Sequence, residues 1–409
     1  MTQINPEKFT VTDFAVREHR SLWGDAWRRL KSSNTARLGM FIVVLFVSTA
    51  TFSHFFWDYE PKKDLDYSLK LKAPNLAVTE EIPSIHPFGT DKLGRDIFRR
   101  VVHGGWNSLR VGIVAVGISL LFGGVIGLLT GFYESTTMTT LERIVLYGIT
   151  GLLLGMLSAW IANQFYQLVV FTGLGISAGY FEGLWAGKYQ RVVFFGVLGA
   201  LLSFGLALFV GLPVALVCGT LGLLAGLLLS VTLDGRFFSN VMMRVMDMIL
   251  SFPGYLLAIA IVAFLGPGLG KGMIAIGVVG IPVYARLTRS AVLSVVNKEY
   301  ILAAHSVGES HGRIILRHIT PNILSPIIVQ TTMGLANAIL SAAALGFLGL
   351  GAIPPEPEWG AMLGDSYRYL TSGAWWAVLF PGLAIMLSVL GFNLLGDGLR
   401  DALDPKLRT

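Results

Sequence analysis

The sequence predicts an all-α fold, a bundle of helices that crosses a membrane many times. Of the 409 residues, 54% are hydrophobic and only 14% are charged, whereas soluble domains carry about 25% charged residues. The mean hydropathy is +0.66. Long apolar runs with few charges are typical of spans of about 20 residues each. The 48 glycines favour close helix packing, because small residues let neighbouring helices approach in lipid.

The apolar runs indicate about ten spans. The first, an anchor, is expected at 38–57, and the second at 108–132. The apolar region 133–240 is long enough for about four more, with a kink as the alternative at the break near Pro213. The last four spans are expected at 245–265, 273–287, 323–348 and 376–395.

The polar segment 1–37 contains an amphipathic pattern. Three apolar residues fall at helical spacing, namely Trp23, Trp27 and Leu30. The cations Arg28, Arg29 and Lys31 are expected to face elsewhere. Such a helix lies in a membrane interface and contacts lipid. The alternative is an ordinary linker beside the first span.

Lysine and arginine in short loops mark the cytoplasmic side of a membrane protein. Their distribution predicts that 1–37 and the tail 399–409 are cytoplasmic and that 58–106 is extracytoplasmic, provided that 133–240 holds an even number of spans. The segment 58–106 nevertheless contains five cations, Lys62, Lys63, Arg95, Arg99 and Arg100. Long translocated segments obey the rule weakly, so the predicted orientation stands.

The net charge of +6 does not indicate a nucleic-acid partner, because the basic residues flank apolar runs and form no basic and aromatic strip. The sequence predicts no metal site: His305, His311 and His318 are not spaced as a helical i, i+4 pair. It also predicts no catalytic residue and no cofactor. The glycines from Gly266 to Lys271 lack both the first glycine and the hydroxyl residue of a phosphate-binding loop.

A polar interruption at 297–321 separates two apolar runs. It predicts a helix from Glu299 to Val307, which Gly308 ends because glycine accepts the left-handed conformation. Ser310 is expected to cap a second helix from His311 to about Ile319, and Pro321 to open the next span. The small residues Ala303 and Ala304 form a smooth face that suits a shallow groove on a partner protein. A structured loop without a partner is the alternative.

Polar residues inside predicted spans are candidates for a solute pathway. They are Asp247, Gln330, Asn337 and Asn393. Hydrogen bonding between helices is the alternative role for the three amides. Asp247 lies near a predicted cytoplasmic helix end, where it can snorkel or pair with Arg244.

Several ordered motifs carry a family resemblance. The residues Ala303-Ala304, Gly308 and Pro321 resemble the loop of bacterial ABC importer permeases that docks on an ATP-binding subunit. Further motifs resemble the C-type permeases of dipeptide, oligopeptide and nickel importers: His86-Pro87-Phe88-Gly89-Thr90-Asp91, Ser251-Phe252-Pro253, Tyr284-Ala285-Arg286, Pro354-Pro355-Glu356-Pro357-Glu358-Trp359-Gly360 and Asn393-Leu394-Leu395-Gly396-Asp397-Gly398. The resemblance covers about 37–134 and 239–408.

This resemblance implies a type I importer permease with a six-span core at 107–398, in the cytoplasmic membrane of a bacterium or archaeon. It implies a second permease subunit, two ATP-binding subunits that hydrolyse ATP, and an extracytoplasmic substrate-binding protein. It implies a peptide-like solute, with nickel as an alternative. The docking loop would comprise Glu299, Tyr300, Ala303, Ala304, Gly308 and Pro321.

The sequence departs from the family pattern in three places. Leu302 replaces the acidic residue of the loop motif, and 341–343 lacks a carboxylate that many relatives carry. Residues 135–238 have no counterpart and are interpreted as an inserted membrane segment. Two other classes of function remain open: an intramembrane enzyme that uses the histidines, and a secondary carrier, which would favour internal repeats.

Overall fold

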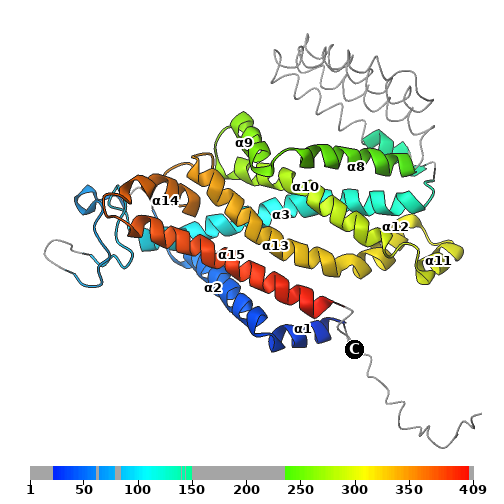
Figure 1. The fold of residues 1–409 in the computed structure, drawn as a ribbon, viewed down its shortest axis with the longest axis horizontal. Helices are drawn as coiled ribbons and strands as arrows, with labels where there is room; N and C mark the ends of the chain where they lie inside the picture. The colour runs from blue at the N-terminus through cyan, green and yellow to red at the C-terminus, as the bar shows by residue number, and fades with distance from the viewer. Residues whose placement is uncertain are drawn as a thin grey trace, which may run out of the picture. The chain divides into compact units, whose positions relative to one another are not determined.

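The helical fold is seen in a computed structural model, which describes residues 22–60, 64–78, 84–139, 141–142, 144–149 and 235–404 (Figure 1). The regular elements of these residues are helices, with two isolated β-bridges before α3. The chain forms two compact units. The first contains Met1–Gly127, Met246–Ala291 and Ser310–Thr409, and the second contains Leu128–Val245 and Val292–Glu309.

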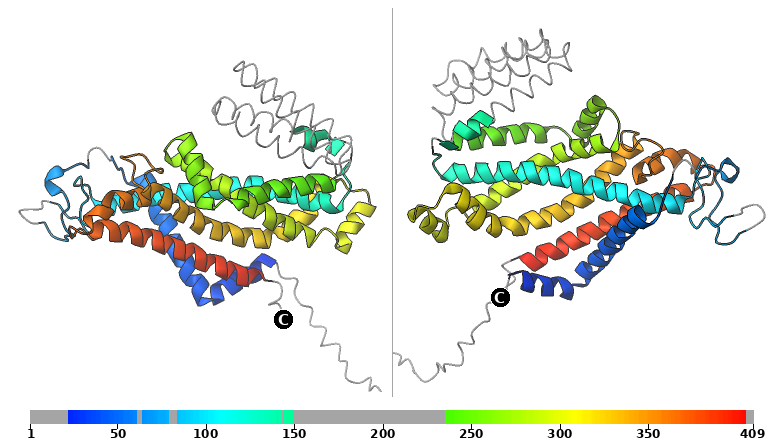
Figure 2. Two further views of the ribbon diagram at one scale, coloured as in Figure 1. Left: turned by 45° about the horizontal axis from the view of Figure 1, so that its top comes forward. Right: turned by 180° about the vertical axis from the view of Figure 1, so that it is seen from behind.

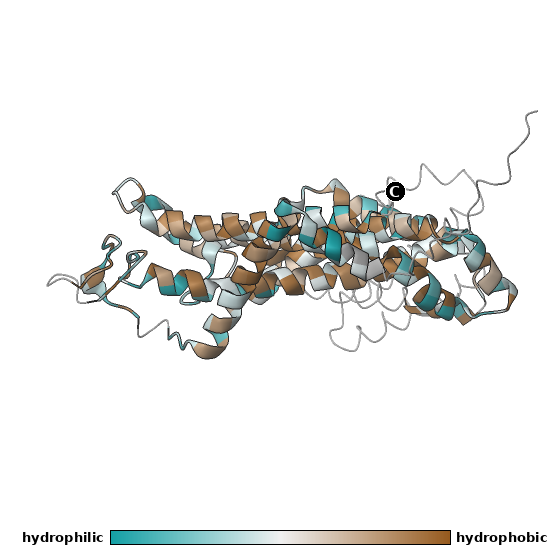
Figure 3. Ribbon diagram, turned by 90° about the horizontal axis from the view of Figure 1, so that it is seen from below, coloured by the Kyte–Doolittle hydropathy of each residue, from teal (hydrophilic) through white to brown (hydrophobic). Residues whose placement is uncertain are grey.

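The helices are bounded as follows: α1 Leu22–Ser32, α2 Asn34–Phe56, α3 Ile97–Ser135, α8 Gly235–Ser251, α9 Gly254–Leu265, α10 Leu269–Leu293, α11 Glu299–Ser306, α12 His311–Arg313, α13 Thr320–Phe347, α14 Trp359–Ser366 and α15 Trp376–Leu403. A π-helix at Ile314–Ile319 joins α12 to α13. Apolar residues predominate along the long helices (Figure 3).

Five of the described helices are long and apolar enough to cross a membrane, and the bent pair of α8 and α9 is a sixth candidate. The predicted spans at 38–57, 108–132, 273–287, 323–348 and 376–395 coincide with α2, α3, α10, α13 and α15. Most of these helices extend further than predicted, because the apolar window marks the membrane part of a helix rather than its ends. The spans expected between 150 and 234 lie outside the described residues.

The predicted single span at 245–265 is wrong as a straight element. The structure has α8 from Gly235 and α9 from Gly254, bent by 90° at the break. Pro253 is the N-cap of α9, and proline disfavours helical backbone in the residue before it. The Phe252-Pro253 step therefore ends α8 within the apolar run.

In the first unit, α2 packs along α15 (Figure 2). Gly39 of α2 lies against Leu394 and Leu395, and Gly398 of α15 lies against Ala36, so that a Cβ atom at either glycine would clash. Leu30 of α1 joins this contact as a buried residue. Small residues thus set the distance between these helices, as the glycine content predicts.

Glycines also set the contact between α3 and α10. Gly123 and Gly127 of α3 lie against the backbone of α10, next to Tyr284 and Thr288. Gly124 has only a side chain of its own helix within 4 Å. Residues i and i+4 share a helix face, so the pair Gly123 and Gly127 forms the close contact with α10.

The predicted amphipathic segment forms a helix, α1, but the expected separation of its side chains is wrong for Lys31. The Nζ atom of Lys31 lies 4.9 Å from the ring centroid of Trp27. The two residues are four apart, so they share one face, and an ammonium group is attracted to an indole ring. Trp27 itself is half exposed.

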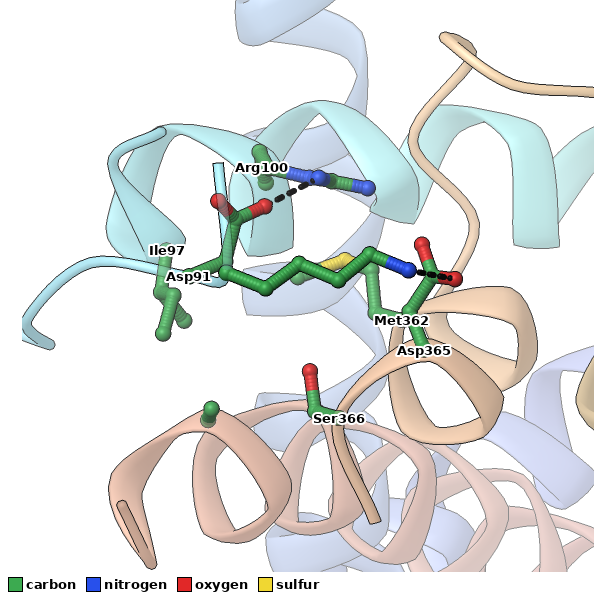
Figure 4. Close-up of a pocket in the computed structure, with 8 residues that line it drawn as sticks. Asp91, Ile97, Arg100, Met362, Asp365 and Ser366 are labelled. Carbon is green, nitrogen blue, oxygen red and sulfur yellow. Dashed lines mark hydrogen bonds and ion pairs between the residues drawn. The ribbon is translucent and has the colours of Figure 1, made fainter. Parts of the chain in front are cut away.

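The arginines around the start of α3 are held in ion pairs within the first unit. Asp91 accepts hydrogen bonds from Arg95 at 2.7 Å and from Arg100 at 2.5 Å, and all three side chains are buried. Lys92 reaches Asp365 of α14 at 2.7 Å, and these groups line a small pocket (Figure 4). Arg99 pairs with Asp64. Three of the five cations that depart from the charge rule are therefore held in ion pairs, and two of them share Asp91.

A buried carboxyl group begins α14. Glu358 is the N-cap, and its two oxygens accept hydrogen bonds from the backbone N–H groups of Gly360 and Ala361, both at 2.8 Å. Gly346 of α13 leaves room for this carboxyl group, since a Cβ atom there would overlap it. Burial raises the pKa of Glu358 above its ordinary value, although the two hydrogen bonds act in the opposite direction.

Candidate coupling site and solute pathway

Helix α11 has a well-defined end. The N–H group of Gly308 donates to the carbonyl of His305, and the N–H group of Glu309 donates to the carbonyl of Ala304. This is a Schellman motif. Gly308 has φ of +75°, a conformation that costs little only for glycine. The predicted helix and its predicted stop are both confirmed, with Ser306 as the last helical residue and Val307 as the C-cap.

One face of α11 is buried in the second unit. Ile301 is fully buried and Ala304 is 7% exposed. The ring of His305 stacks on Phe132 near the end of α3, with centroids 6.1 Å apart. The expectation that Ala303 and Ala304 form one exposed face is wrong. Adjacent helical residues point about 100° apart, and here only Ala303 is exposed.

The rest of the surface of α11 is exposed and partly apolar. Tyr300 is 40% exposed, Leu302 54% and Val307 82%. Partial burial raises the pKa of the Tyr300 hydroxyl above its ordinary value. Leu302, which sequence reasoning treated only as a missing carboxylate, is thus one of the largest exposed groups on this helix. Leu302 directly precedes the small residue Ala303 of the predicted docking loop, and this position in the sequence could have identified it as a contact residue.

The second half of the hairpin differs from the prediction. Ser310 is the N-cap of α12, but its side chain makes no capping hydrogen bond. Instead of ending before Pro321, the helix continues through the π-helix into α13, where Pro321 is the second residue. The Thr320 hydroxyl donates to the carbonyl of Ile315, and the Asn322 amide donates to that of His318. These two side chains donate hydrogen bonds to backbone carbonyls in the turn around Pro321, which has no N–H group of its own to donate.

Asp247 is the predicted pathway residue with the clearest contact. Its carboxylate accepts a hydrogen bond from Arg286 of α10 at 2.6 Å. The side chain of Arg286 is 53% exposed and that of Asp247 is 44% exposed. The structure therefore pairs Asp247 with Arg286 rather than with Arg244, which was one of the two alternatives for this residue. Sequence reasoning missed Arg286, because the two residues come from helices 39 positions apart.

The predicted amides lie on two other helices. Gln330 and Asn337 are seven residues apart on α13, so they share one face, and Asn337 is exposed. The backbone carbonyl of Gln330 accepts a hydrogen bond from the Tyr284 hydroxyl at 3.3 Å. Asn393 is half-buried on α15. Of the four pathway candidates, Asp247 is thus the one for which the structure gives a partner for the side chain.

In the second unit, the two ends of the predicted insert lie close together. The carbonyl of Glu134 accepts from Arg236 at 3.3 Å, and its carboxylate accepts from Ser239 at 3.4 Å. The backbone of Gly235 lies directly against Tyr133. The chain therefore leaves α3 and returns to α8 at nearly the same place.

Two family models match the chain. The binding-protein-dependent transport system inner membrane component matches residues 220–409. The N-terminal TM domain of oligopeptide transport permease C matches residues 21–74. The second match covers α1 and α2, and the first covers every described helix from α8 to α15.

Curated relatives extend over nearly the whole chain. The dipeptide transport system permease protein of Alkalihalophilus pseudofirmus is 36% identical over 389 residues, which cover 95% of this chain and 91% of that relative. The glutathione transport system permease protein of Escherichia coli is 33% identical, covering 95% of this chain and 92% of the relative.

A third relative, the di/tripeptide transport system permease protein of Pseudomonas aeruginosa, is 49% identical over 203 residues, which cover 50% of this chain. These residues are 66% of that relative, so its length is about 310 residues against 409 here. The length and identity of these matches, together with the membrane helices, place the chain in a family: it belongs to the inner membrane components of binding-protein-dependent transport systems, which are the permease subunits of ABC importers.

Proposed function

We propose that the chain is one of two permease subunits of its importer and that it helps to carry a dipeptide or oligopeptide across the cytoplasmic membrane. The names of its relatives support this solute, since they refer to dipeptides, di/tripeptides and glutathione. All of these are peptides, which favours a peptide over nickel. The family works with separate ATP-binding subunits, where ATP is hydrolysed, and with a substrate-binding protein.

The proposed site of force transfer is the hairpin that contains α11. The observation that carries this proposal is an eight-residue helix with exposed apolar side chains on and directly after it, closed by a glycine-dependent turn. A rigid helix with exposed Leu302 and Val307 can fill an apolar groove on an ATP-binding subunit. Closure of the ATP-binding pair would move α11 and switch the permease between two arrangements.

We further propose that both termini are cytoplasmic and that the 58–106 segment and α14 are extracytoplasmic. In this orientation the ends of the insert are cytoplasmic. The bent pair of α8 and α9 would cross the membrane outward and α10 would cross it inward, so the α10–α11 connection would also be cytoplasmic. The exposed aromatic residues Tyr367 and Trp375, after α14, would then be available to the substrate-binding protein. The exposed Trp27 and Lys31 of α1 would contact lipid at the cytoplasmic surface.

The test is uptake of a labelled dipeptide by proteoliposomes that contain the complete importer. Leu302→Arg introduces a charge on the exposed face of α11 without changing its buried face. We expect uptake and substrate-stimulated ATP hydrolysis to fall more than tenfold, because the arginine would be desolvated against an apolar groove. Leu76→Arg is the matched control, since Leu76 is 79% exposed in the segment before α3. Normal activity of Leu302→Arg would contradict docking through α11, and failure of the wild-type importer to carry any peptide would contradict the proposed solute.

A further inference from the structure

The pair Asp247–Arg286 is an unusual feature of the membrane part of the first unit. Asp247 lies in α8 and Arg286 in α10, within or next to predicted spans, and about half of each side chain is exposed. Charged groups in contact with hydrocarbon cost free energy, so ionisable residues at such positions face an aqueous cavity, a protein partner or, near a helix end, the lipid headgroups. An exposed ion pair on these helices therefore indicates a polar surface.

Further polar groups lie on the same helix faces. Ser251 follows Asp247 by four residues, Ser290 follows Arg286 by four residues, and both serines are exposed. Residues i and i+4 share a helix face, so each helix presents one charged group and one hydroxyl group on its exposed side. This combination suits a hydrated solute rather than a lipid chain.

We infer that Asp247 and Arg286 form a binding site for the two charged ends of a zwitterionic peptide. The Asp247 carboxylate would bind the α-ammonium group, and the Arg286 guanidinium group would bind the α-carboxylate group, with which arginine forms paired hydrogen bonds. In the structure the two side chains satisfy each other at 2.6 Å. A bound peptide would replace this ion pair with two others, one between its ammonium group and Asp247 and one between its carboxylate group and Arg286.

The charges of the pair explain why such a site suits transport. The pair is neutral overall, so a zwitterion binds without adding a net charge to the membrane interior, unlike a solute with a single charge. The free energy of the broken ion pair offsets part of the binding free energy, which keeps the affinity low enough for release. This inference rests on the proposed peptide solute and adds to it the groups that recognise the solute.

The experiment uses the importer in lipid nanodiscs, with its second permease and ATP-binding subunits but without nucleotide or substrate-binding protein. Saturation-transfer NMR measures the relative affinities of Gly-Phe, N-acetyl-Gly-Phe and Gly-Phe amide at millimolar concentration. We expect the wild type to prefer Gly-Phe about fivefold over each blocked peptide, the scale of one partly exposed charge pair.

The variants assign each end of the peptide to one residue. Asp247→Asn should abolish the preference over the N-acetyl peptide but keep the preference over the amide. Arg286→Gln should have the opposite effect, and Arg286→Lys should restore part of the carboxylate preference. Lys271→Gln is the matched control, because it removes an exposed cation from the first turn of the same helix; both preferences should persist.

Two results would overturn the inference. One is a wild-type importer that does not discriminate among the three peptides. The other is an equal loss of affinity for all three peptides in Asp247→Asn and Arg286→Gln, which indicates a brace between α8 and α10. Either result leaves the proposed function intact if the wild-type importer still takes up dipeptide with ATP. Absence of that uptake would instead contradict the proposed function.

Discussion

At the scale of single residues, the proposed docking of an ATP-binding subunit depends on the exposed side chains of α11. Leu302 occupies the position where the family motif has an acid, and more than half of its side chain is exposed. A leucine at the centre of a contact favours an apolar surface on the partner, whereas a carboxylate favours a basic one. The leucine at this position therefore predicts an apolar contact surface on the ATP-binding subunit.

Restoring an acid at this position should weaken coupling. In Leu302→Glu, the new carboxylate would lose water against an apolar partner surface without gaining a charge partner. We expect peptide uptake by the reconstituted importer to fall at least tenfold, while Leu302→Met stays within about twofold of wild type. Higher uptake in Leu302→Glu than in wild type would indicate a basic groove and contradict this interpretation.

Some residue-level features could be predicted from the sequence and others could not. Gly308 was predictable because its left-handed conformation is a local property. The burial of Ala304, the pairing of Arg286 with Asp247, and the burial of Arg95 and Arg100 around Asp91 all depend on contacts between distant segments or on which helix face is covered. A single sequence records the residue types in such contacts but not their partners.

At the scale of elements, α14 depends on a buried acid at its N-terminus. The unfolded chain leaves Glu358 with an ordinary pKa, whereas burial raises its pKa in the folded chain. The unfolded state therefore releases this proton at lower pH than the folded state does. The contribution of Glu358 to the free energy of unfolding is therefore largest below its ordinary pKa. It decreases as the pH rises from this ordinary pKa through the raised pKa of the folded chain.

Two substitutions separate the charge of Glu358 from its capping role. Glu358→Gln removes the titration but keeps one oxygen acceptor, so its melting temperature should depend less on pH between 4 and 8 than that of wild type. Glu358→Ala leaves a buried N–H group and a part-buried one without their acceptor and should destabilise the importer by about 1–2 kcal/mol at every pH. The measurement is thermal unfolding of the purified importer. Identical pH dependence of wild type and Glu358→Gln would contradict the raised pKa.

The helices also show which features an apolar sequence pattern does not predict. The runs that form α2, α13 and α15 were predictable, because each is one continuous apolar stretch of membrane length. The break between α8 and α9 was not recognised, although Pro253 marks it, because the flanking residues remain apolar through the bend. The π-helix before α13 has no comparable sequence signal. Hydropathy therefore locates spans better than it locates their ends and bends.

At the scale of the whole molecule, we interpret residues 135–238 as an extra segment. One relative, of about 310 residues, is shorter than this chain, whereas the matches to two others cover 95% of this chain. The contacts of Glu134 with Arg236 and Ser239 bring the two ends of the extra segment together. An insertion at such a place does not require the flanking helices to move apart. This geometry supports the interpretation of 135–238 as an addition to a six-span core.

Removing the extra segment tests that interpretation. Replacement of residues 136–234 by a linker of four glycines should give a chain that still assembles with its partner subunits, because the ends already lie close together and a short loop costs little entropy. Co-purification of the subunits and dipeptide uptake are the measurements. A linker of twelve glycines controls for strain. Loss of assembly with both linkers would show that the segment is part of the core.

The central claim is that a separate ATP-binding subunit moves this permease through α11. The most direct measurement is disulfide cross-linking in a Cys218→Ser background, since Cys218 is the single cysteine of the chain. The exposed Ala303 is changed to cysteine, and the buried Ala304 serves as the matched control. We predict that Ala303→Cys forms a cross-link to a cysteine in the groove of the ATP-binding subunit and that Ala304→Cys does not. Labelling of Ala303→Cys only from the extracytoplasmic side, with no cross-link, would contradict the account.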